Sequence, residues 1–442
     1  MRRTRRLHPG QVVAAAFAVT ITVGTALLSL PWSHRGNSSL MDALFTATSA
    51  VCVTGLTVVD TSTHWTTLGQ VIIMGLIQVG GLGIMTLATL AALLLSRRLG
   101  VRSRLIVQAE SQSMKAPDVR RVVRRVVGFS LLCEAVVALI LTGQLIIRHD
   151  EGPALALYHG IFHAVSSFNN AGFSTYPNNL VPFAADPLFL ITICVAIIVG
   201  GLGFPVVFEL ARSWRSPKSW SVLTRVTVVV TTALLVAGTF LIGLVEMSNP
   251  LTMGQYGFGH GSVLSFFTAV QPRTAGFNAV DVGAMRPETL FVTDLLMFIG
   301  GGSAGTAGGI KVTTFGILLY VVWSQARGEN NVNVGRRRIP TDVQRQAVAL
   351  TLLAGGLVTV ATFVLLVMTR FPFEAVLFEA LSAFSTVGLS VGITASLPVD
   401  AQIIVVLLMF IGRVGPLTVA SALALRESRS RYELPEERMI VG

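Results

Sequence analysis

The stretch Arg273-Thr274-Ala275-Gly276-Phe277 decides the fold, because three other stretches of the chain repeat its pattern. They are Cys52-Val53-Thr54-Gly55-Leu56, Asn169-Asn170-Ala171-Gly172-Phe173 and Ser385-Thr386-Val387-Gly388-Leu389. Each has one glycine followed by an apolar residue, with a short amphipathic run before it and a long apolar segment after it. Four matched units indicate internal repetition. We interpret each unit as a helix, a re-entrant pore loop and a second helix.

The four loops are expected to meet around one axis, because irregular backbone at membrane depth occurs only inside protein or beside a water-filled cavity. Glycine permits backbone angles that leave successive carbonyls pointing inward. Rings of such carbonyls replace the water shell of a monovalent cation. The short helix before each loop adds a partial negative charge at its C-terminal end. The alternative is that the glycines occupy ordinary helix-packing positions, since glycine is common in membrane helices.

The composition places the chain in a lipid bilayer. Of its 442 residues, 52% are hydrophobic and 12% are charged, and the mean hydropathy is +0.71. A soluble domain carries about 25% charged residues. We therefore expect one all-α integral membrane domain, residues 1–442, with four tandem helix–pore loop–helix repeats in a pseudo-fourfold arrangement around one ion pore. The expected repeats are about 11–96, 119–214, 220–325 and 341–426, followed by a cytoplasmic tail, 427–442. They give eight spanning helices, of which the second helix of unit two covers 187–214, and four half-helices. The loop 328–338 is polar and basic, and it is expected to be mobile.

The net charge of +11 is a signal of topology and not of nucleic-acid binding. Most of the 33 Lys and Arg residues fall at the two chain ends and in alternate loops between helices. The positive-inside rule then places both termini and these loops in the cytoplasm. The apolar run 12–30 is longer than a signal-peptide core, so we interpret it as the first membrane helix. The three cysteines have no CxxC spacing and support neither a disulfide nor a zinc framework.

The run from Gly300 to Lys311 interrupts the second helix of the third unit. Its six glycines remove roughly 6 kcal/mol of helix propensity, at about 1 kcal/mol each. The helix is therefore expected to break there, beneath the loops. The run also satisfies G-x-G-x-x-G, but a dinucleotide site needs a preceding strand, and a P-loop needs Gly and Lys adjacent, where Ile310 intervenes. Close packing of helices through small residues is the remaining alternative.

Arg413 lies in the equivalent part of the fourth unit. An arginine at that depth is costly and normally faces a cavity or a partner. Because a cation below a cation filter does not attract the ion, we interpret Arg413 as a brake or as an anchor for the glycine run. The alternatives are a structural salt bridge or a shallower, snorkelling position. Lys311 is a similar but weaker candidate.

The sequence resembles the Trk/Ktr/HKT superfamily of potassium transporters, closest to its bacterial KtrB branch. The resemblance runs from about residue 11 to about residue 425. It is carried by Phe168-Asn169-Asn170-Ala171-Gly172-Phe173, by Arg273-Thr274-Ala275-Gly276-Phe277, by the run 300–311 and by Arg413. The first pore loop comes so early that one helix fits before it. This departs from the TrkH pattern, which has extra N-terminal helices, and favours the KtrB branch.

The resemblance implies potassium uptake through a multi-pass protein of the plasma (inner) membrane, and no enzymatic activity. The implied potassium-binding filter residues are Val53, Thr54, Gly55, Asn170, Ala171, Gly172, Thr274, Ala275, Gly276, Thr386, Val387 and Gly388. The implied gate, an intramembrane loop that blocks the pore and moves to open it, is formed by Gly300, Gly301, Gly302, Ser303, Ala304, Gly305, Thr306, Ala307, Gly308 and Gly309. Lys311 and Arg413 are assigned to the same gate.

The resemblance also implies a homodimer in membrane lipid, sodium dependence and a cytosolic KtrA-like ring of RCK domains. Because no nucleotide site is visible in this chain, a nucleotide of the ATP/ADP or NAD type would act only through that partner. No cofactor is expected in the chain, and no metal beyond the transported potassium. Trk-like or HKT-like transport linked to sodium or protons is the alternative. A polytopic membrane enzyme is a weaker one, since no nucleophile–base pair stands out.

Some polar residues have simpler interpretations. His159 and His163 have the spacing of a zinc pair, but no third ligand is evident, so packing and hydrogen bonding are favoured. Glu134 and Asp294 lie in apolar helices, and their role is not assigned. Glycine in all four loops fits potassium-selective members, whereas a serine in the first loop of related plant transporters accompanies sodium transport.

Overall fold

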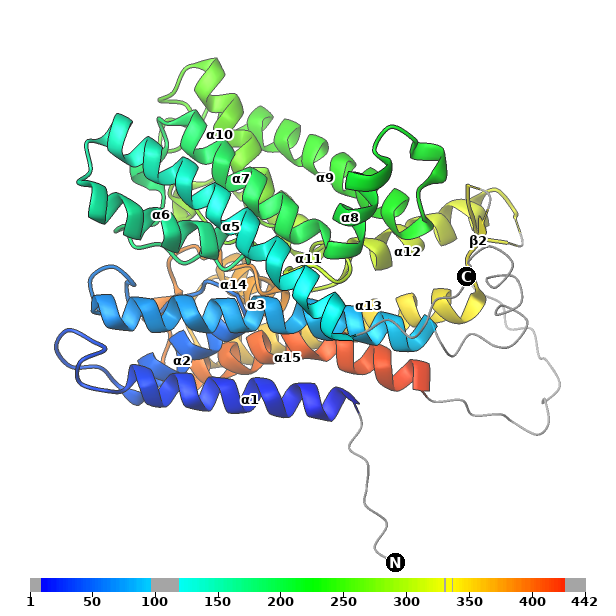
Figure 1. Cartoon of the computed structure of the whole chain (residues 1–442), viewed down its shortest axis with the longest axis horizontal. Coiled ribbons are helices and arrows are strands. Elements are labelled where there is room, and N and C mark those ends of the chain that lie inside the picture. The colour runs from blue at the N-terminus through cyan, green and yellow to red at the C-terminus, as the bar shows by residue number, and fades with distance from the viewer. Residues whose placement is uncertain (1–8, 97–118, 330, 336, 426–442) are drawn as a thin grey trace, which may run out of the picture.

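The structure is a computed structural model that describes residues 9–96, 119–329, 331–335 and 337–425. The predicted 427–442 tail and most of the first basic loop, 97–125, lie outside the described residues. Long helices run side by side through the molecule, with shorter helices packed among them (Figure 1). The expected all-α membrane fold is confirmed. In the described part of the chain the strands are confined to one hairpin, β1 (Asn333–Val334) with β2 (Arg337–Arg338).

The helices follow the repeat. The first two units contain α1 (Pro9–Leu28), α2 (Leu40–Val51), α3 (Thr67–Ser96), α5 (Val119–His149), α6 (Pro153–Phe168), α7 (Pro187–Leu202) and α8 (Phe204–Ser213). The last two contain α9 (Val222–Glu246), α10 (Phe258–Val270), α11 (Pro287–Phe298), α12 (Val312–Ala326), α13 (Thr341–Met368), α14 (Phe373–Ser385) and α15 (Val399–Leu425). Short 3₁₀ turns lie at Val181–Phe183, Pro217–Ser219, Val282–Ala284 and Thr394–Ser396. In every unit the short helix (α2, α6, α10 or α14) ends where the repeated glycine loop begins.

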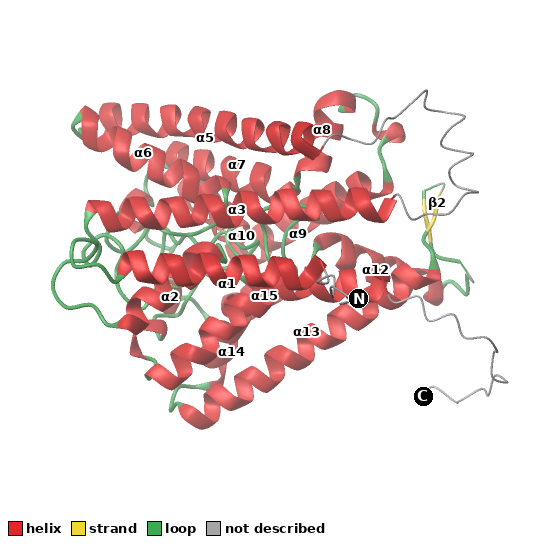
Figure 2. Ribbon diagram, turned by 60° about the horizontal axis from the view of Figure 1, so that its bottom comes forward, coloured by secondary structure: helices red, strands yellow, loops and turns green. Residues whose placement is uncertain are grey.

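Four described helices are long and apolar enough to cross a bilayer on their own, and they are the first helices of the four units. The spans are Gln11–Leu28, Val123–His149, Val222–Glu246 and Thr341–Met368. The short helices are too short to span, as expected of re-entrant segments. Figure 2 shows the long loops gathered at one end of the molecule and the β1–β2 hairpin at the other. The first residues of α1 and the last residues of α15 lie toward the hairpin end (Figure 1).

The units close into a ring through one repeated contact. The second helix of each unit packs against the short helix of the next: α3 on α6, α7 on α10, α11 on α14, and α15 on α2. The first and last helices, α1 and α15, also pack together. Because the fourth unit returns to the first, the short helices and their loops surround a common centre, as the pseudo-fourfold prediction requires.

Close backbone contacts explain a second set of glycines. A Cβ added to Gly80 would lie 2.0 Å from the Val51 carbonyl oxygen. A Cβ added to Gly200 would lie 1.9 Å from the carbonyl oxygen of Phe168, and one added to Gly412 would lie 1.7 Å from that of Phe384. A side chain there would push the second helix away from the end of its own short helix. The helix-packing interpretation therefore applies to these three glycines and not to the loop glycines.

Two predicted helices are broken, and one predicted loop is ordered. The second helix of unit two, expected over 187–214, bends by 103° between α7 and α8. The bend lies at Gly203, whose φ is +92°, and Pro205 follows in the first turn of α8. The second helix of unit three is interrupted between α11 and α12, as predicted. The 328–338 loop, expected to be mobile, instead forms the hairpin, whose Val332 and Val334 are buried in a small apolar cluster.

Candidate functional site

The four glycine loops share one unusual backbone conformation. The loop glycines have positive φ angles: +98° at Gly55, +69° at Gly172, +75° at Gly276 and +96° at Gly388. Two residues earlier, each loop has a second positive φ at a residue that is not glycine, namely Val53, Asn170, Thr274 and Thr386. A positive φ at such residues is uncommon and costs free energy. Its recurrence at the same place in four loops marks a conformation that the surrounding structure enforces.

The four loop glycines form a closed ring. An added Cβ at Gly55 would lie 2.5 Å from the Ala171 carbonyl oxygen, and one at Gly172 would lie 2.8 Å from that of Ala275. A Cβ added to Gly276 would lie 2.3 Å from the Val387 carbonyl oxygen, and one added to Gly388 would lie 2.2 Å from the Thr54 carbonyl oxygen. Each glycine therefore touches the next loop, and the fourth touches the first. The structure brings the predicted filter residues of all four loops together around one axis.

The loop amides bond away from this axis. The Thr54 N–H donates to the Ser49 carbonyl at 2.8 Å, and the Ala171 N–H to that of Ser166 at 2.7 Å. The corresponding bonds run from Ala275 to Gln271 at 3.0 Å and from Val387 to Ser382 at 2.8 Å. These amides are therefore satisfied at the C-terminal ends of the short helices. The carbonyls that lie beside the neighbouring loop's glycine, those of Thr54, Ala171, Ala275 and Val387, remain available as ligands. The Gly172 carbonyl, by contrast, accepts from Nδ2 of Asn179 at 3.1 Å. Carbonyl oxygens are hard ligands suited to an unhydrated monovalent cation.

Hydroxyl groups add to this polar centre. The Oγ1 atoms of Thr54, Thr274 and Thr386 are buried, and within the described residues they have no hydrogen-bond partner. Buried polar groups are normally paired, so three orphaned hydroxyls beside a carbonyl ring fit a site that handles a cation or water. The four short helices also end at the loops, which directs their C-terminal dipoles to the same place.

The filter loops of units two and four are each followed by a serine that makes the same pair of hydrogen bonds. In unit two, the Ser174 hydroxyl donates to Nε2 of His163 at 2.9 Å and accepts from the Tyr176 N–H at 3.1 Å. In unit four, the Ser390 hydroxyl donates to Oε2 of Glu379 at 2.9 Å and accepts from the Gly392 N–H at 3.0 Å. His163 lies nine residues before Gly172, and Glu379 lies nine residues before Gly388, so the two residues occupy equivalent positions in their units. Sequence reasoning missed this pair, although aligning the repeats would have placed the two residues together.

The interrupted segment between α11 and α12, residues 299–311, lies against the starts of the filter loops. At Gly308 an added Cβ would lie 2.0 Å from Oγ1 of Thr386, and at Gly309 it would lie 3.2 Å from Cα of Ser385. The Thr306 hydroxyl donates to Oδ1 of Asn170 at 3.1 Å. The segment therefore packs on the side of the ring where the short helices end. We call residues 299–311 the glycine segment.

The glycine segment also packs into the bend of unit two. The Gly302 N–H donates to the Gly201 carbonyl at 2.8 Å, and the Thr306 N–H to that of Gly200 at 3.3 Å. An added Cβ at Gly203 would lie 2.3 Å from the Ser303 carbonyl oxygen. The bend between α7 and α8 thus makes room for the segment, which explains why the predicted single helix breaks.

Basic side chains hold the segment through its carbonyls. Arg413 is 3% exposed, and its Nη1 donates to the Thr306 carbonyl. The Lys311 ammonium donates to the Ala307 carbonyl within the segment itself. Within the described residues, Nε and Nη2 of Arg413 have no partner, and Arg413 makes no salt bridge. The anchor interpretation of Arg413 agrees with this geometry better than the salt-bridge alternative.

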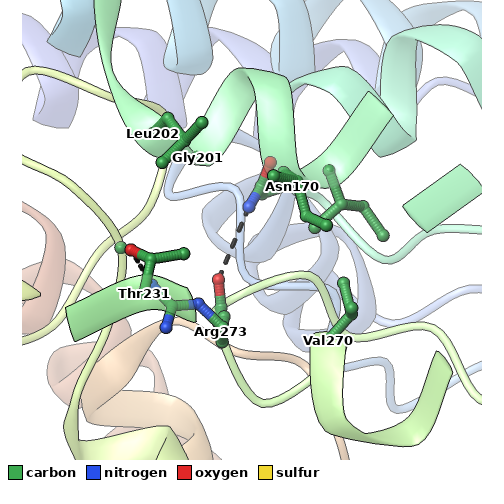
Figure 3. Close-up of a pocket in the computed structure, with 9 residues that line it drawn as sticks. Asn170, Gly201, Leu202, Thr231, Val270 and Arg273 are labelled. Carbon is green, nitrogen blue, oxygen red and sulfur yellow. Dashed lines mark hydrogen bonds between the residues drawn. The ribbon is translucent and has the colours of Figure 1, made fainter. Parts of the chain in front are cut away.

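Arg273 is a third basic contact, which sequence reasoning did not assign. Its Nη2 donates to the Gly300 carbonyl and to Oγ1 of Thr231, both at 3.3 Å. Its own carbonyl accepts from Nδ2 of Asn170 at 3.5 Å. Figure 3 shows Arg273, Asn170 and Thr231 facing one another around a small cavity, with Gly201 and Leu202 at its edge. Arg273 therefore belongs both to the third filter loop and to the contacts of the glycine segment.

Comparison with known proteins agrees with this geometry. The profile of the TrkH family, described as cation transport proteins, matches residues 2–432. The chain belongs to the TrkH family of cation transport proteins. The Ktr system potassium uptake protein B of Bacillus subtilis (strain 168) is 40% identical over 99% of this chain and 97% of its own length. The protein of the same name from Vibrio alginolyticus is 36% identical over 98% of this chain and 94% of its own length.

Two further relatives extend the comparison. The potassium/sodium uptake protein NtpJ of Enterococcus hirae is 35% identical over all of this chain and 99% of its own length. The crystal structure of the potassium transporter TrkH from Vibrio parahaemolyticus matches with a TM-score of 0.73 at 17% identity, covering 95% of this chain and 86% of that one. This last likeness shows that the fold is shared. The relatives are named as transporters, and this TrkH-family chain is likewise a transport protein and not an enzyme.

Of the remaining polar candidates of this TrkH-family chain, His159 and Glu134 have structural partners. His159 pairs with Glu151 at 3.1 Å, and in the described part of the chain no three His, Cys, Asp or Glu side chains are placed to hold a metal. Glu134 accepts from Nε2 of Gln78 at 3.0 and 3.1 Å and from Nδ2 of Asn169 at 3.0 Å. These bonds join units one and two behind the second loop. Nothing in the structure explains Asp294.

Proposed function

We propose that the chain takes up potassium across the plasma membrane through the ring formed by its four glycine loops. The closed ring of Gly55, Gly172, Gly276 and Gly388 is the observation that carries this proposal. The loop carbonyls replace the hydration shell of the ion, and the dipoles of the short helices stabilise its charge. The full-length relatives named for potassium uptake support potassium as the cargo.

In this proposal the glycine segment is the gate. It lies against the starts of the filter loops and is held by Arg413 and Arg273. Moving it aside opens the path from the ring to the cytoplasm. Backbone with so many glycines can adopt more than one conformation at small cost, which suits a segment that must move.

The proposed assembly is a homodimer, with both termini cytoplasmic, that binds a cytosolic nucleotide-sensing ring of the KtrA type. The relatives described as parts of a Ktr system support the presence of a further component. We also propose that uptake depends on sodium, and the relative named for potassium and sodium uptake supports this. Transport of sodium itself is the second candidate function, favoured by that same name.

Rubidium flux into liposomes that contain the purified chain tests the proposal directly. We expect rubidium uptake that potassium competes away, that rises when sodium is added, and that changes when a cytosolic nucleotide-binding ring is supplied. An empty-liposome preparation is the control. Sodium uptake that potassium does not inhibit would instead support the second candidate, and no flux of either ion would refute both.

Gly55→Ser is expected to weaken the preference for potassium over sodium. The backbone at Gly55 has a φ of +98°, and an added Cβ would lie 2.5 Å from the Ala171 carbonyl oxygen. The first loop must shift to relieve this contact, which loosens the carbonyl ring that discriminates between the ions. The measurement is the sodium concentration that halves rubidium uptake, which should fall by about tenfold, or 1.4 kcal/mol. An unchanged concentration would show that the first loop does not set selectivity.

A further inference from the structure

We propose that the filter and the gate of this protein form one hydrogen-bonded unit, joined by Asn170 and Arg273, so that the position of the gate sets the ion preference of the filter. The inference rests on the proposed function, because it assumes that the ring is the filter and the glycine segment is the gate. It adds that two residues of the filter loops hold the gate directly.

The first link runs from the second filter loop. Asn170 directly precedes Ala171 and Gly172, and it has a positive φ of 60°. Its Oδ1 accepts from the hydroxyl of Thr306, in the middle of the glycine segment, at 3.1 Å. Both side chains are fully buried, so water does not compete for this bond. When Thr306 moves away, Oδ1 of Asn170 loses this partner, and the strained conformation of the loop loses a support.

The second link runs from the third filter loop. Arg273 directly precedes Thr274 and lies three residues before Gly276 of the ring, and it is 7% exposed. It donates to the carbonyl of Gly300, the second residue of the glycine segment after α11. Its Nη1 is buried and has no partner in the described structure, and the side chain borders the small cavity of Figure 3. The guanidinium therefore has a spare donor and space beside it to follow a displaced carbonyl.

The two links are connected to each other. The Nδ2 atom of Asn170 donates to the carbonyl of Arg273, so the second and third loops are joined at the residues that also hold the segment. The backbone carbonyl of Thr306 accepts a hydrogen bond from Nη1 of Arg413. A continuous path of bonds thus runs from Arg413 through Thr306 and Asn170 to Arg273 and back to the segment at Gly300. The segment is therefore hydrogen-bonded to two of the four filter loops, and moving it alters both of these links.

This connection has a reciprocal consequence. If the gate position changes the affinity of the filter for an ion, then that ion must shift the gate equilibrium by the same factor. Potassium in the ring stabilises the loop conformation that presents Asn170 and Arg273 to the segment. Potassium should therefore hold the segment more firmly than sodium does, even though neither ion touches the segment.

Thr306→Val tests the first link alone. It removes the hydroxyl that bonds Asn170 but keeps the backbone carbonyl that Arg413 uses. Ser303→Ala is the matched control, because Ser303 lies in the same segment but its hydroxyl pairs with Thr313 of α12 at 2.7 Å and not with the filter. Both variants loosen the segment, so both can change the rate of rubidium uptake. We expect Thr306→Val alone to change the rubidium-to-sodium uptake ratio, by about fivefold or more, which is the lower end of typical coupling between sites.

Hydrogen–deuterium exchange of residues 299–311 gives a readout without transport. We expect slower exchange in potassium than in sodium for the wild type and for Ser303→Ala, and equal exchange in the two ions for Thr306→Val. Arg273→Lys should reduce the difference in the same way. Gel filtration confirms that each variant is folded.

The outcomes separate this inference from the proposed function. If the wild type carries no rubidium, the proposed function fails. If it carries rubidium but Thr306→Val and Ser303→Ala have the same ion ratio, or if exchange of the segment is equal in potassium and sodium, the coupling of gate and filter is refuted while the transport function stands.

Discussion

Gly276→Ala is expected to abolish potassium uptake. Gly276 has a φ of +75°, and an added Cβ would lie 2.3 Å from the Val387 carbonyl oxygen and 3.0 Å from Cα of Gly388. A left-handed conformation costs an alanine roughly 1–2 kcal/mol. The larger effect is steric, because both contacts are with backbone of the neighbouring loop, which cannot rotate away. The third and fourth loops must separate, and the ring then opens at one corner.

The measurement is rubidium uptake into liposomes at matched protein amounts, and we expect a loss of at least about a hundredfold, or 2.7 kcal/mol. Gly143→Ala is the matched control, because Gly143 lies inside α5 and an added Cβ there has no neighbour within 4 Å. That change should leave uptake unaltered, since alanine is the better helix former. Uptake by Gly276→Ala comparable with that of the control would mean that the ring is not the conduction path.

The repeat and its loops could be predicted from the sequence because they depend on local pattern. The sequence alone shows a glycine at the same place in four units. It also shows the short apolar run before each glycine and the long apolar run after it. The bend at Gly203 was also readable, since Gly203 and Pro205 together are typical of a helix end. The prediction of one continuous helix over 187–214 was wrong. It followed the apolar pattern, which continues through Gly203 and Pro205 without a change.

The contacts that hold the glycine segment could not be predicted in this way. Arg273 was part of the motif from the start, but its bond to Gly300 depends on how the third filter loop folds back against the end of α11 within unit three. The bend between α7 and α8 is needed to admit the segment, and that requirement exists only in three dimensions. Likewise, the hairpin at 333–338 forms because Val332 and Val334 find an apolar surface on α9 and α12, which polar composition alone does not reveal.

Arg413→Ala is expected to raise potassium uptake by the chain alone. Arg413 is fully enclosed, and its Nη1 holds the carbonyl of Thr306, the residue that also bonds the filter at Asn170. A hydrogen bond from a charged group contributes about 1.5–3 kcal/mol. If the bond forms only when the segment closes the pore, its loss shifts the gate toward the open state by about tenfold or more. Lys311 cannot replace it, because its ammonium bonds within the segment itself.

The measurement is the initial rate of rubidium uptake, with Arg370→Ala as the control, since Arg370 is an exposed arginine between α13 and α14. Arg413→Lys separates two explanations of a higher rate. If the positive charge itself repels the ion, lysine retains the block and the rate stays low. If the guanidinium is an anchor, lysine, with one compact ammonium in place of a fixed fork of donors, holds Thr306 less well and the rate rises part of the way. We expect the second result, because the spare donors of Arg413 lie unpaired beside the segment and its bond ends on the segment's backbone. A rate for Arg413→Ala at or below that of the wild type would show instead that Arg413 supports the conducting state.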